Sequence, residues 1–152
     1  MAVRESGMRN LKKCKHRVHE LVMPNVSDSL HDIRAFTSES IKGLPFSKAA
    51  EWDIVLAVGE AATNCVEHGQ SVAGVHNVIR TRILVQNDGI KIELHDSGHH
   101  FNPDVKKWPP PDLTSEKGRG IFIIKSLMDG VEYPPVDNGT LCVLTKKFDC
   151  GG

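Results

Sequence analysis

The stretch Glu60-Ala-Ala-Thr-Asn64-Cys-Val-Glu-His68-Gly69 is the most informative part of this chain. Read as a helix at about 100° per residue, it sets Glu60 and Asn64 within roughly 40° of each other. Glu67 falls on the same side. An apolar arc centred roughly 130° away is formed by Ile54, Val58, Ala61 and Cys65. The acid and the amide therefore flank the core-facing stripe, where a pocket between helix and sheet would open. The ordinary alternative is that both are solvated surface residues.

A second carboxylate follows a predicted hairpin. The apolar-rich run Val78–Val85 leads into Asn87-Asp-Gly89, which is a strong hairpin signal. Residues 90–96 then alternate apolar and polar side chains, as a half-buried strand does. Asp96 lies where this strand ends and the chain turns at Gly98. A carboxylate there can accept a hydrogen bond from an exocyclic amine and give selectivity, whereas the alternative is an ordinary turn-forming aspartate.

Residues 98–120 differ in composition from the rest of the chain. Histidines and three consecutive prolines leave no helical or strand periodicity, and a segment of this length is usually functional, commonly a lid over a ligand. Gly118 and Gly120 then precede an apolar helix predicted over residues 121–128. Glycines before a helix N-terminus let backbone N–H groups approach a phosphate. This glycine pair alone is weak evidence, and no GxxxxGK[ST] Walker motif occurs in the chain.

The remaining segments predict an α+β fold. A strand is expected over residues 16–22, a helix over 27–41 with Ser27 and Asp28 as caps, and a long helix from about Ser47. Strands over residues 131–133 and 140–148 follow. Helices gathered on one face of an antiparallel or mixed sheet form a two-layer sandwich. We expect a single domain over residues 1–152, with a flexible tail at 1–15 and the lid at 98–120.

Composition excludes some classes of function. Nineteen basic and nineteen acidic residues cancel, which argues against direct nucleic-acid binding because that requires a basic footprint. No apolar run is long enough for a membrane span, and the first residues do not resemble a signal peptide. Cysteines without CxxC spacing fit a reducing cytosol, with Cys65 and Cys142 expected in the core. His95, His99 and His100 lack zinc-site spacing, so no metal is expected there.

Taken together and in this order, the motifs resemble the GHKL ATPase superfamily, and within it the bacterial anti-sigma-factor serine/threonine kinases. The similarity covers residues 16–148. Its specific part is Glu60-Ala-x-Thr-Asn64-x-x-x-His68-Gly69, and Ser126-Leu-Met-Asp129 and Gly139-Thr140 support it. The resemblance implies the histidine-kinase-like ATPase (Bergerat) fold, with ATP bound between helices and sheet and Mg²⁺ as the metal.

The resemblance also implies a role for each matching residue. Glu60 corresponds to the general base, Asn64 to the Mg²⁺ ligand and Asp96 to the residue that reads adenine. The expected nucleotide-binding residues are Asn64, Asp96, Gly98, Gly118, Arg119, Gly120 and Thr140. The chain departs from the family pattern at His99-His100 and at Arg119, where smaller, acidic or apolar residues are commoner.

The function implied by the resemblance is that of a cytoplasmic kinase. It would phosphorylate a serine or threonine on a small antagonist protein and would bind a sigma factor, and the family suggests a homodimer. Two other functions remain open. The chain could be an ATP-binding switch without phosphotransfer, although Glu60 would then have no purpose beside the metal ligand. It could also be a detached histidine-kinase catalytic domain, although no segment carries a dimerisation helix with a phosphoacceptor histidine.

Overall fold

A computed structural model describes residues 17–68, 77–97 and 119–149 of the chain. The expected tail at 1–15 and residues 98–118 of the expected lid lie outside these ranges, and so do Gly98 and Gly118. Within the described ranges, five strands form one sheet in the order β1-β2-β3-β5-β4. Every neighbouring pair is antiparallel. Of the two sheet types that the sequence allowed, the antiparallel one is therefore correct.

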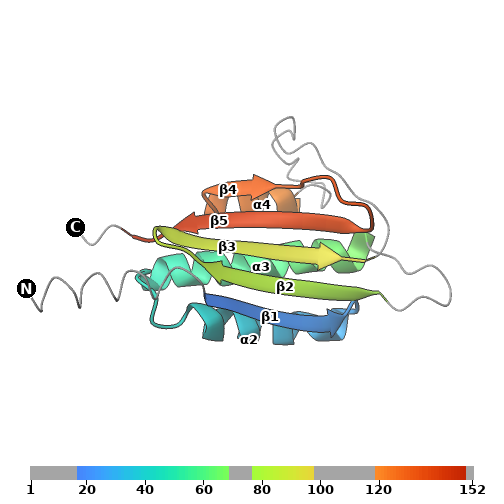
Figure 1. Cartoon of the computed structure of the whole chain (residues 1–152), viewed down its shortest axis with the longest axis horizontal. Helices are drawn as coiled ribbons and strands as arrows, with labels where there is room; N and C mark the ends of the chain where they lie inside the picture. Colours follow the sequence, from blue (N-terminus) through green and yellow to red (C-terminus); the bar gives the residue numbers. More distant parts are fainter. Residues whose placement is uncertain (1–16, 69–76, 98–118, 150–152) are drawn as a thin grey trace, which may run out of the picture.

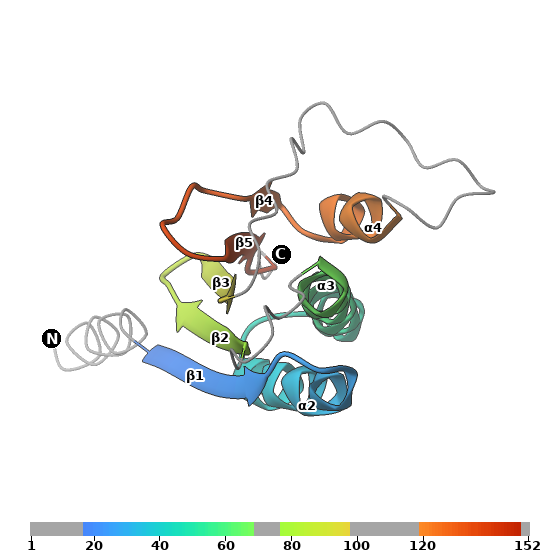
Figure 2. The same ribbon diagram turned by 90° about the vertical axis from the view of Figure 1, so that its right-hand side faces the viewer.

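The strands are β1 (Arg17–Pro24), β2 (Val78–Val85), β3 (Gly89–Asp96), β4 (Gly130–Glu132) and β5 (Thr140–Lys147). The helices are α2 (Leu30–Ile41), α3 (Lys48–His68) and α4 (Arg119–Leu127), and a 3₁₀ turn, η2 (Ser27–Ser29), precedes α2. The sheet is seen face-on in Figure 1, with the helices behind it. Figure 2 shows the three helices side by side against one face of the sheet. The predicted α+β sandwich in two layers is confirmed.

The core lies between the two layers because the strand and helix periodicities meet there. Alternate residues of β2 and β3 face the helices, and the inward-facing row of β3 is Ile90, Ile92, Leu94 and Asp96. The predicted apolar arc of α3, which comprises Ile54, Val58, Ala61 and Cys65, is buried against them. Each large apolar side chain buried in this way contributes roughly 1.5–3 kcal/mol. The same alternation carries Asp96 onto the core face, at the end of an apolar row.

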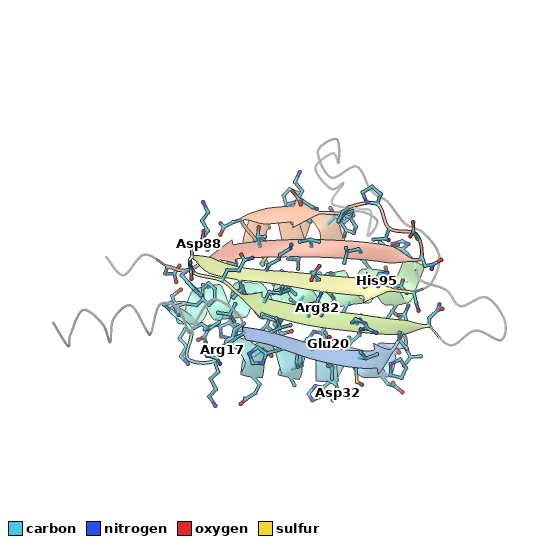
Figure 3. The ribbon with its side chains drawn as sticks, in the orientation of Figure 1. Arg17, Glu20, Asp32, Arg82, Asp88 and His95 are labelled. Carbon is cyan, nitrogen blue, oxygen red and sulfur yellow. The ribbon has the colours of Figure 1, made fainter. Side chains whose placement is uncertain are left out.

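The opposite face of the sheet carries charged side chains, together with the exposed Val18 and Val22 of β1. Figure 3 shows Glu20, Arg82 and His95 on it, on three neighbouring strands. Arg82 donates from Nη1 to Glu93 at 3.1 Å, and Arg80 donates from Nη1 to Glu20 at 2.9 Å. The Arg80–Glu20 pair is solvent-exposed, and exposed pairs contribute only about 0–1 kcal/mol each. The Arg82–Glu93 pair is partly buried.

Two boundaries near the start of the chain differ from the prediction. β1 extends to Pro24 instead of ending at residue 22, because its pairing with β2 continues to the Pro24–Val78 pair. The helix expected from Ser27 begins as the 3₁₀ turn η2, and no side-chain cap is formed at the start of η2 or of α2. Ser29, which directly precedes α2, instead donates its hydroxyl to the Pro24 carbonyl at 2.7 Å.

The start of α3 agrees with the sequence. The hydroxyl of Ser47 accepts a hydrogen bond from the Ala50 N–H at 3.1 Å, which is the geometry of an N-cap. The N–H of Ser47 donates to Asp149 at 2.6 Å, so the end of the described chain is tied to the same point. None of the helices that the structure describes is both long and apolar enough to span a membrane.

We expect Ser47→Ala to lower the free energy of unfolding by about 1 kcal/mol, because the Ala50 N–H loses its acceptor. Chemical denaturation followed by circular dichroism measures this change. Ser38→Ala, on the exposed side of α2, is the matched control and should change stability by less than about 0.5 kcal/mol. If the two variants were equally stable, the Ser47 cap would contribute nothing to α3.

Candidate active site

A cleft opens between the C-terminal half of α3 and the ends of β3 and β5. Together with space that is open to solvent it comprises about 270 Å³, and it is lined by Ala61, Asn64, Cys65, His68, Leu94, Asp96, Tyr133, Thr140 and Cys142. Asn64, Asp96 and Thr140, which the sequence analysis selected separately, all line this one cleft.

Asp96 is the buried acid of the cleft, with only 2 % of its surface exposed. It pairs in register with Thr140 of β5, so both polar side chains emerge on the helix-facing side of the sheet. A carboxylate in such surroundings must be hydrogen-bonded to remain charged. Asn25 supplies one donor, because its Nδ2 donates to Asp96 Oδ1 at 3.0 Å.

Asn25 is a site residue that the sequence analysis missed. Its Nδ2 also donates to the backbone carbonyl of Cys65 at 3.0 Å. Its backbone N–H donates to the carbonyl of Asn77 at 2.9 Å. Asn25 therefore joins the end of β1 to α3 and to β3. No local pattern could have revealed this, because Pro24-Asn25 has the composition of an ordinary turn and Asp96 lies 71 residues further along the chain.

Glu60 and Asn64 lie directly beside the start of α4. A Cβ atom placed on Gly120 would lie 3.2 Å from Asn64 Oδ1 and 3.3 Å from Glu60 Oε2. A glycine at this position therefore lets the backbone of α4 approach both side chains. The prediction that Gly120 precedes the helix is wrong, because α4 begins at Arg119 and contains Gly120 in its first turn. The first N–H groups of a helix lack intrahelical acceptors and, together with the helix dipole, favour an anion.

The side chain of Asn64 has unused hydrogen-bonding capacity. Its Nδ2 is buried and makes no hydrogen bond of ordinary geometry with the described residues, although the side chain interacts with the Tyr133 phenol. An unsatisfied buried donor costs about 1–3 kcal/mol, which a bound ligand would recover. The amide oxygen is a neutral ligand of the type that Mg²⁺ accepts, since Mg²⁺ is usually held by few protein oxygens together with phosphates and water. The residues present therefore fit a nucleotide–metal site.

A glycine in the left-handed conformation shapes the other end of the cleft. Gly139 has a φ of 70°, and a Cβ atom on it would overlap the carbonyl oxygen of Asp96. Only glycine adopts this conformation without strain and permits such a close approach. The Gly139-Thr140 pair noted in the sequence therefore has a physical reason: the glycine brings β5 against the end of β3, and Thr140 follows into the cleft.

Burial controls the protonation of the sulfur and phenol groups that line the cleft. Burial raises the pKa of the Cys142 thiol to about 12. Burial also raises the pKa of Cys65, and the negative charge of the nearby Asp96 carboxylate raises it further. Burial likewise raises the pKa of the Tyr133 phenol. All three groups are therefore neutral near pH 7, and the thiols are poor nucleophiles. As the sequence predicted, Cys65 and Cys142 are free, buried cysteines.

The other predicted residues are Arg119, two glycines and the histidine cluster. Arg119 is the first residue of α4, and Gly98 and Gly118 lie outside the described residues. Of the histidine cluster, His95 forms a hydrogen bond through Nε2 with the carbonyl of Asn138 at 2.9 Å. His99 and His100 also lie outside the described part of the chain.

Similarity to known proteins agrees with this geometry. The serine-protein kinase RsbW of Halalkalibacterium halodurans is 30 % identical over 141 residues, which are 86 % of this chain and 86 % of that protein. RsbW of Listeria monocytogenes is 31 % identical over 112 residues, which are 68 % and 70 % of the two chains. The crystal structure of the RsbU and RsbW domains of a Mycobacterium tuberculosis protein matches with a TM-score of 0.61. That match has 17 % identity and covers 86 % of this chain and 31 % of the other, so it shows the fold alone.

The match to a domain family extends over most of the chain. Residues 23–146 match the histidine kinase-like ATPase domain, a range that includes α3, the cleft and Asn25. The matched fold is therefore the one that the sequence resemblance implied. In this chain it holds an acid and an amide one helical turn apart, a buried aspartate at a strand end and a glycine in the first turn of α4. By this match and by its similarity to the RsbW proteins, the chain belongs to the histidine kinase-like ATPase domain family.

Proposed function

We propose that this chain is an ATP-dependent serine/threonine protein kinase that acts as an anti-sigma factor. The observation that carries the proposal is the position of Glu60 and Asn64, which both face the first turn of α4 at one side of the cleft that ends in Asp96. Similarity to proteins named serine-protein kinase RsbW supports the choice of a hydroxyl as phosphate acceptor. A cytoplasmic location agrees with such a role.

Base recognition is proposed for the Asp96 end of the cleft. The carboxylate would accept a hydrogen bond from the 6-amine of adenine, with the hydroxyl of Thr140 beside it. Leu94, Ala61 and the two neutral thiols provide the apolar walls that a purine ring prefers. A buried acceptor discriminates well against bases that lack the amine, because it would then remain unsatisfied.

Phosphate binding is proposed for the side of the cleft lined by Asn64, where Glu60 also lies against the first turn of α4. The N–H groups in the first turn of α4 would donate to phosphate oxygens, and Gly120 gives the ligand room to approach. Asn64 would hold Mg²⁺ through Oδ1, and Mg²⁺ when bound neutralises phosphate charge in the manner general for phosphoryl transfer. An amide is suited to this position because it adds no negative charge near the phosphates.

Glu60 is proposed as the general base. It is half-buried one helical turn before Asn64, on the side of α3 that faces α4. Its carboxylate would accept the proton of an incoming serine or threonine hydroxyl as the hydroxyl oxygen bonds to the γ-phosphorus. The bond between that phosphorus and its bridging oxygen breaks, and ADP leaves.

The proposed acceptor is a small antagonist protein, and the proposed client is a sigma factor. Phosphorylation would make the antagonist dissociate, which would leave this chain able to bind the sigma factor. The net charge of zero agrees with an action through protein partners instead of through DNA. Incubation with γ-labelled ATP and candidate antagonists from the same genome tests this proposal. Acid-stable phosphoserine or phosphothreonine supports it, acid-labile phosphohistidine would support the histidine-kinase alternative, and binding without transfer would support the switch.

We expect Asn64→Ala and Asp96→Asn to weaken MgATP binding for different reasons. Asn64→Ala removes the proposed metal oxygen, so the loss should appear with Mg²⁺ and be small in EDTA. In Asp96→Asn the amide oxygen can still accept from Asn25, but the amide nitrogen then faces the adenine amine, which is also a donor. The resulting loss of affinity should be independent of the metal. Isothermal titration calorimetry measures both, with an expected weakening of about tenfold or more. Wild-type affinity in either variant removes that residue from the site.

Glu60→Gln should separate chemistry from binding. Glutamine keeps the shape and hydrogen bonding of the side chain but is no base, so phosphate transfer should fall by about 10²–10⁴-fold. Calorimetry should show nearly unchanged nucleotide affinity. Glu67→Gln changes an exposed acid about two helical turns further along α3; it is the control and should transfer phosphate at the wild-type rate. Full transfer activity in Glu60→Gln would exclude the general-base role.

Gly120→Ala should weaken nucleotide binding without destabilising the fold. The added Cβ would crowd Asn64 and Glu60 at 3.2–3.3 Å, whereas alanine favours the helix over glycine by up to about 1 kcal/mol. We therefore expect an unchanged or higher melting temperature in the absence of nucleotide and a smaller rise on addition of MgATP. Thermal shift measurements with and without MgATP test this. A variant that melts lower but keeps the full rise would contradict the proposed approach of phosphate to α4.

A further inference from the structure

We infer that Asn25 is a positioning residue that sets base selectivity by orienting the carboxylate of Asp96. The inference rests on the proposed function, because it assumes that Asp96 reads the adenine amine. Asn25 follows β1 directly, and its side chain donates to Asp96 Oδ1 and to the Cys65 carbonyl, both at 3.0 Å. One side chain thus joins the acid of the sheet to the helix that carries Glu60 and Asn64.

The two hydrogen bonds use the amide group of Asn25 fully as a donor. An amide nitrogen carries two hydrogens, and the two acceptors, a carboxylate and a backbone carbonyl, are both oxygens. The Cys65 carbonyl lies in the last turn of α3, where carbonyls lack intrahelical partners. Replacement of Asn25 by an acid of the same shape would turn both attractions into repulsions.

The effect of Asn25 should fall on the side chain of Asp96 more than on its backbone. The backbone at the end of β3 is held separately, since the Ser97 N–H donates to the Val78 carbonyl at 3.3 Å and the Ser97 hydroxyl accepts from the Val78 N–H at 3.1 Å. β3 is also paired on both sides up to Asp96. The bond from Asn25 to Oδ1 fixes the rotation of the carboxylate about its last torsion, and the direction of Oδ2 follows from that rotation.

The test compares ATP with purine riboside triphosphate, the analogue that carries hydrogen in place of the 6-amine. Calorimetry of the full chain gives the ratio of the two dissociation constants, which reports the amine contact alone. In the wild type we expect ATP to bind about 10–100-fold tighter. In Asn25→Asp we expect the ratio to fall to within about threefold, with analogue binding changed far less than ATP binding.

Two further variants keep the test independent of folding. Asn25→Ala removes the donor without an added charge and should also lower the ratio. Ser29→Ala is the control, because it removes the hydrogen bond from Ser29 to the Pro24 carbonyl in the same segment between β1 and α2. Ser29 does not bond to Asp96, so this variant should keep the wild-type ratio. Melting temperatures of all variants show whether a change in the ratio merely follows lost stability.

Several outcomes would overturn the inference. A wild-type ratio in both Asn25 variants, or an equal loss of affinity for both nucleotides, would mean that Asn25 does not orient Asp96. If Ser29→Ala also lowered the ratio of dissociation constants, the effect would belong to the whole segment between β1 and α2 and not to Asn25. If the wild type itself bound the two nucleotides equally, Asp96 would not read the amine, so base recognition in the proposed function would fail together with the inference.

Discussion

A carboxylate buried at the end of an apolar strand is the constraint on which the rest of the cleft depends. Asp96 continues the row of Ile90, Ile92 and Leu94 on the core face of β3. A charge in that position is costly unless donors surround it. The structure meets this requirement with Asn25 from the end of β1, and Thr140 lies opposite Asp96 on β5. The ends of three strands are thereby brought together around one acid.

The helix α3 stabilises the fold and also carries the site. Its apolar arc packs on the sheet, and Glu60 and Asn64 lie at the edge of that arc, next to α4. A site on the flank of a packed helix has a fixed position, because the backbone of α3 cannot shift without disturbing the core. This arrangement also explains the glycine in the first turn of α4. A side chain there would fill the space between the two helices that the proposed phosphates need.

The two faces of the sheet differ in their chemistry. The outer face carries alternating acids and bases on β1, β2 and β3, which pair with one another at the surface. The inner face ends in a cleft whose thiols and phenol are neutral and which contains the Asp96 carboxylate. Charge on the outer face is compensated locally and is screened by solvent. A hydrogen bond inside the cleft is stronger because the surroundings are less polar, and the proposed effect of Asn25 on selectivity depends on this.

The sequence by itself determined the helices and strands and which of their faces are buried. Apolar side chains recur about every 3.6 residues in α3 and every two residues in β3, and these patterns depend only on neighbours along the chain. The apolar arc of α3 and the inward position of Asp96 could therefore be predicted. The cap at Ser47 and the hairpin after β2 are local in the same sense. Boundaries were less certain where pairing decides them, as at Pro24, which belongs to β1 because β2 continues opposite it.

Only the tertiary structure decided which residues share a site. Asn25 has no local signature, and its role follows from a contact with Asp96 across 71 residues. The need for glycine at position 120 arises from Asn64 and Glu60 on another helix, and the need for glycine at position 139 arises from the carbonyl of Asp96 on another strand. Such constraints come from the packing of elements that are distant in sequence. Patterns within a segment determined what each element is, and the contacts between elements decided what the assembled cleft can recognise.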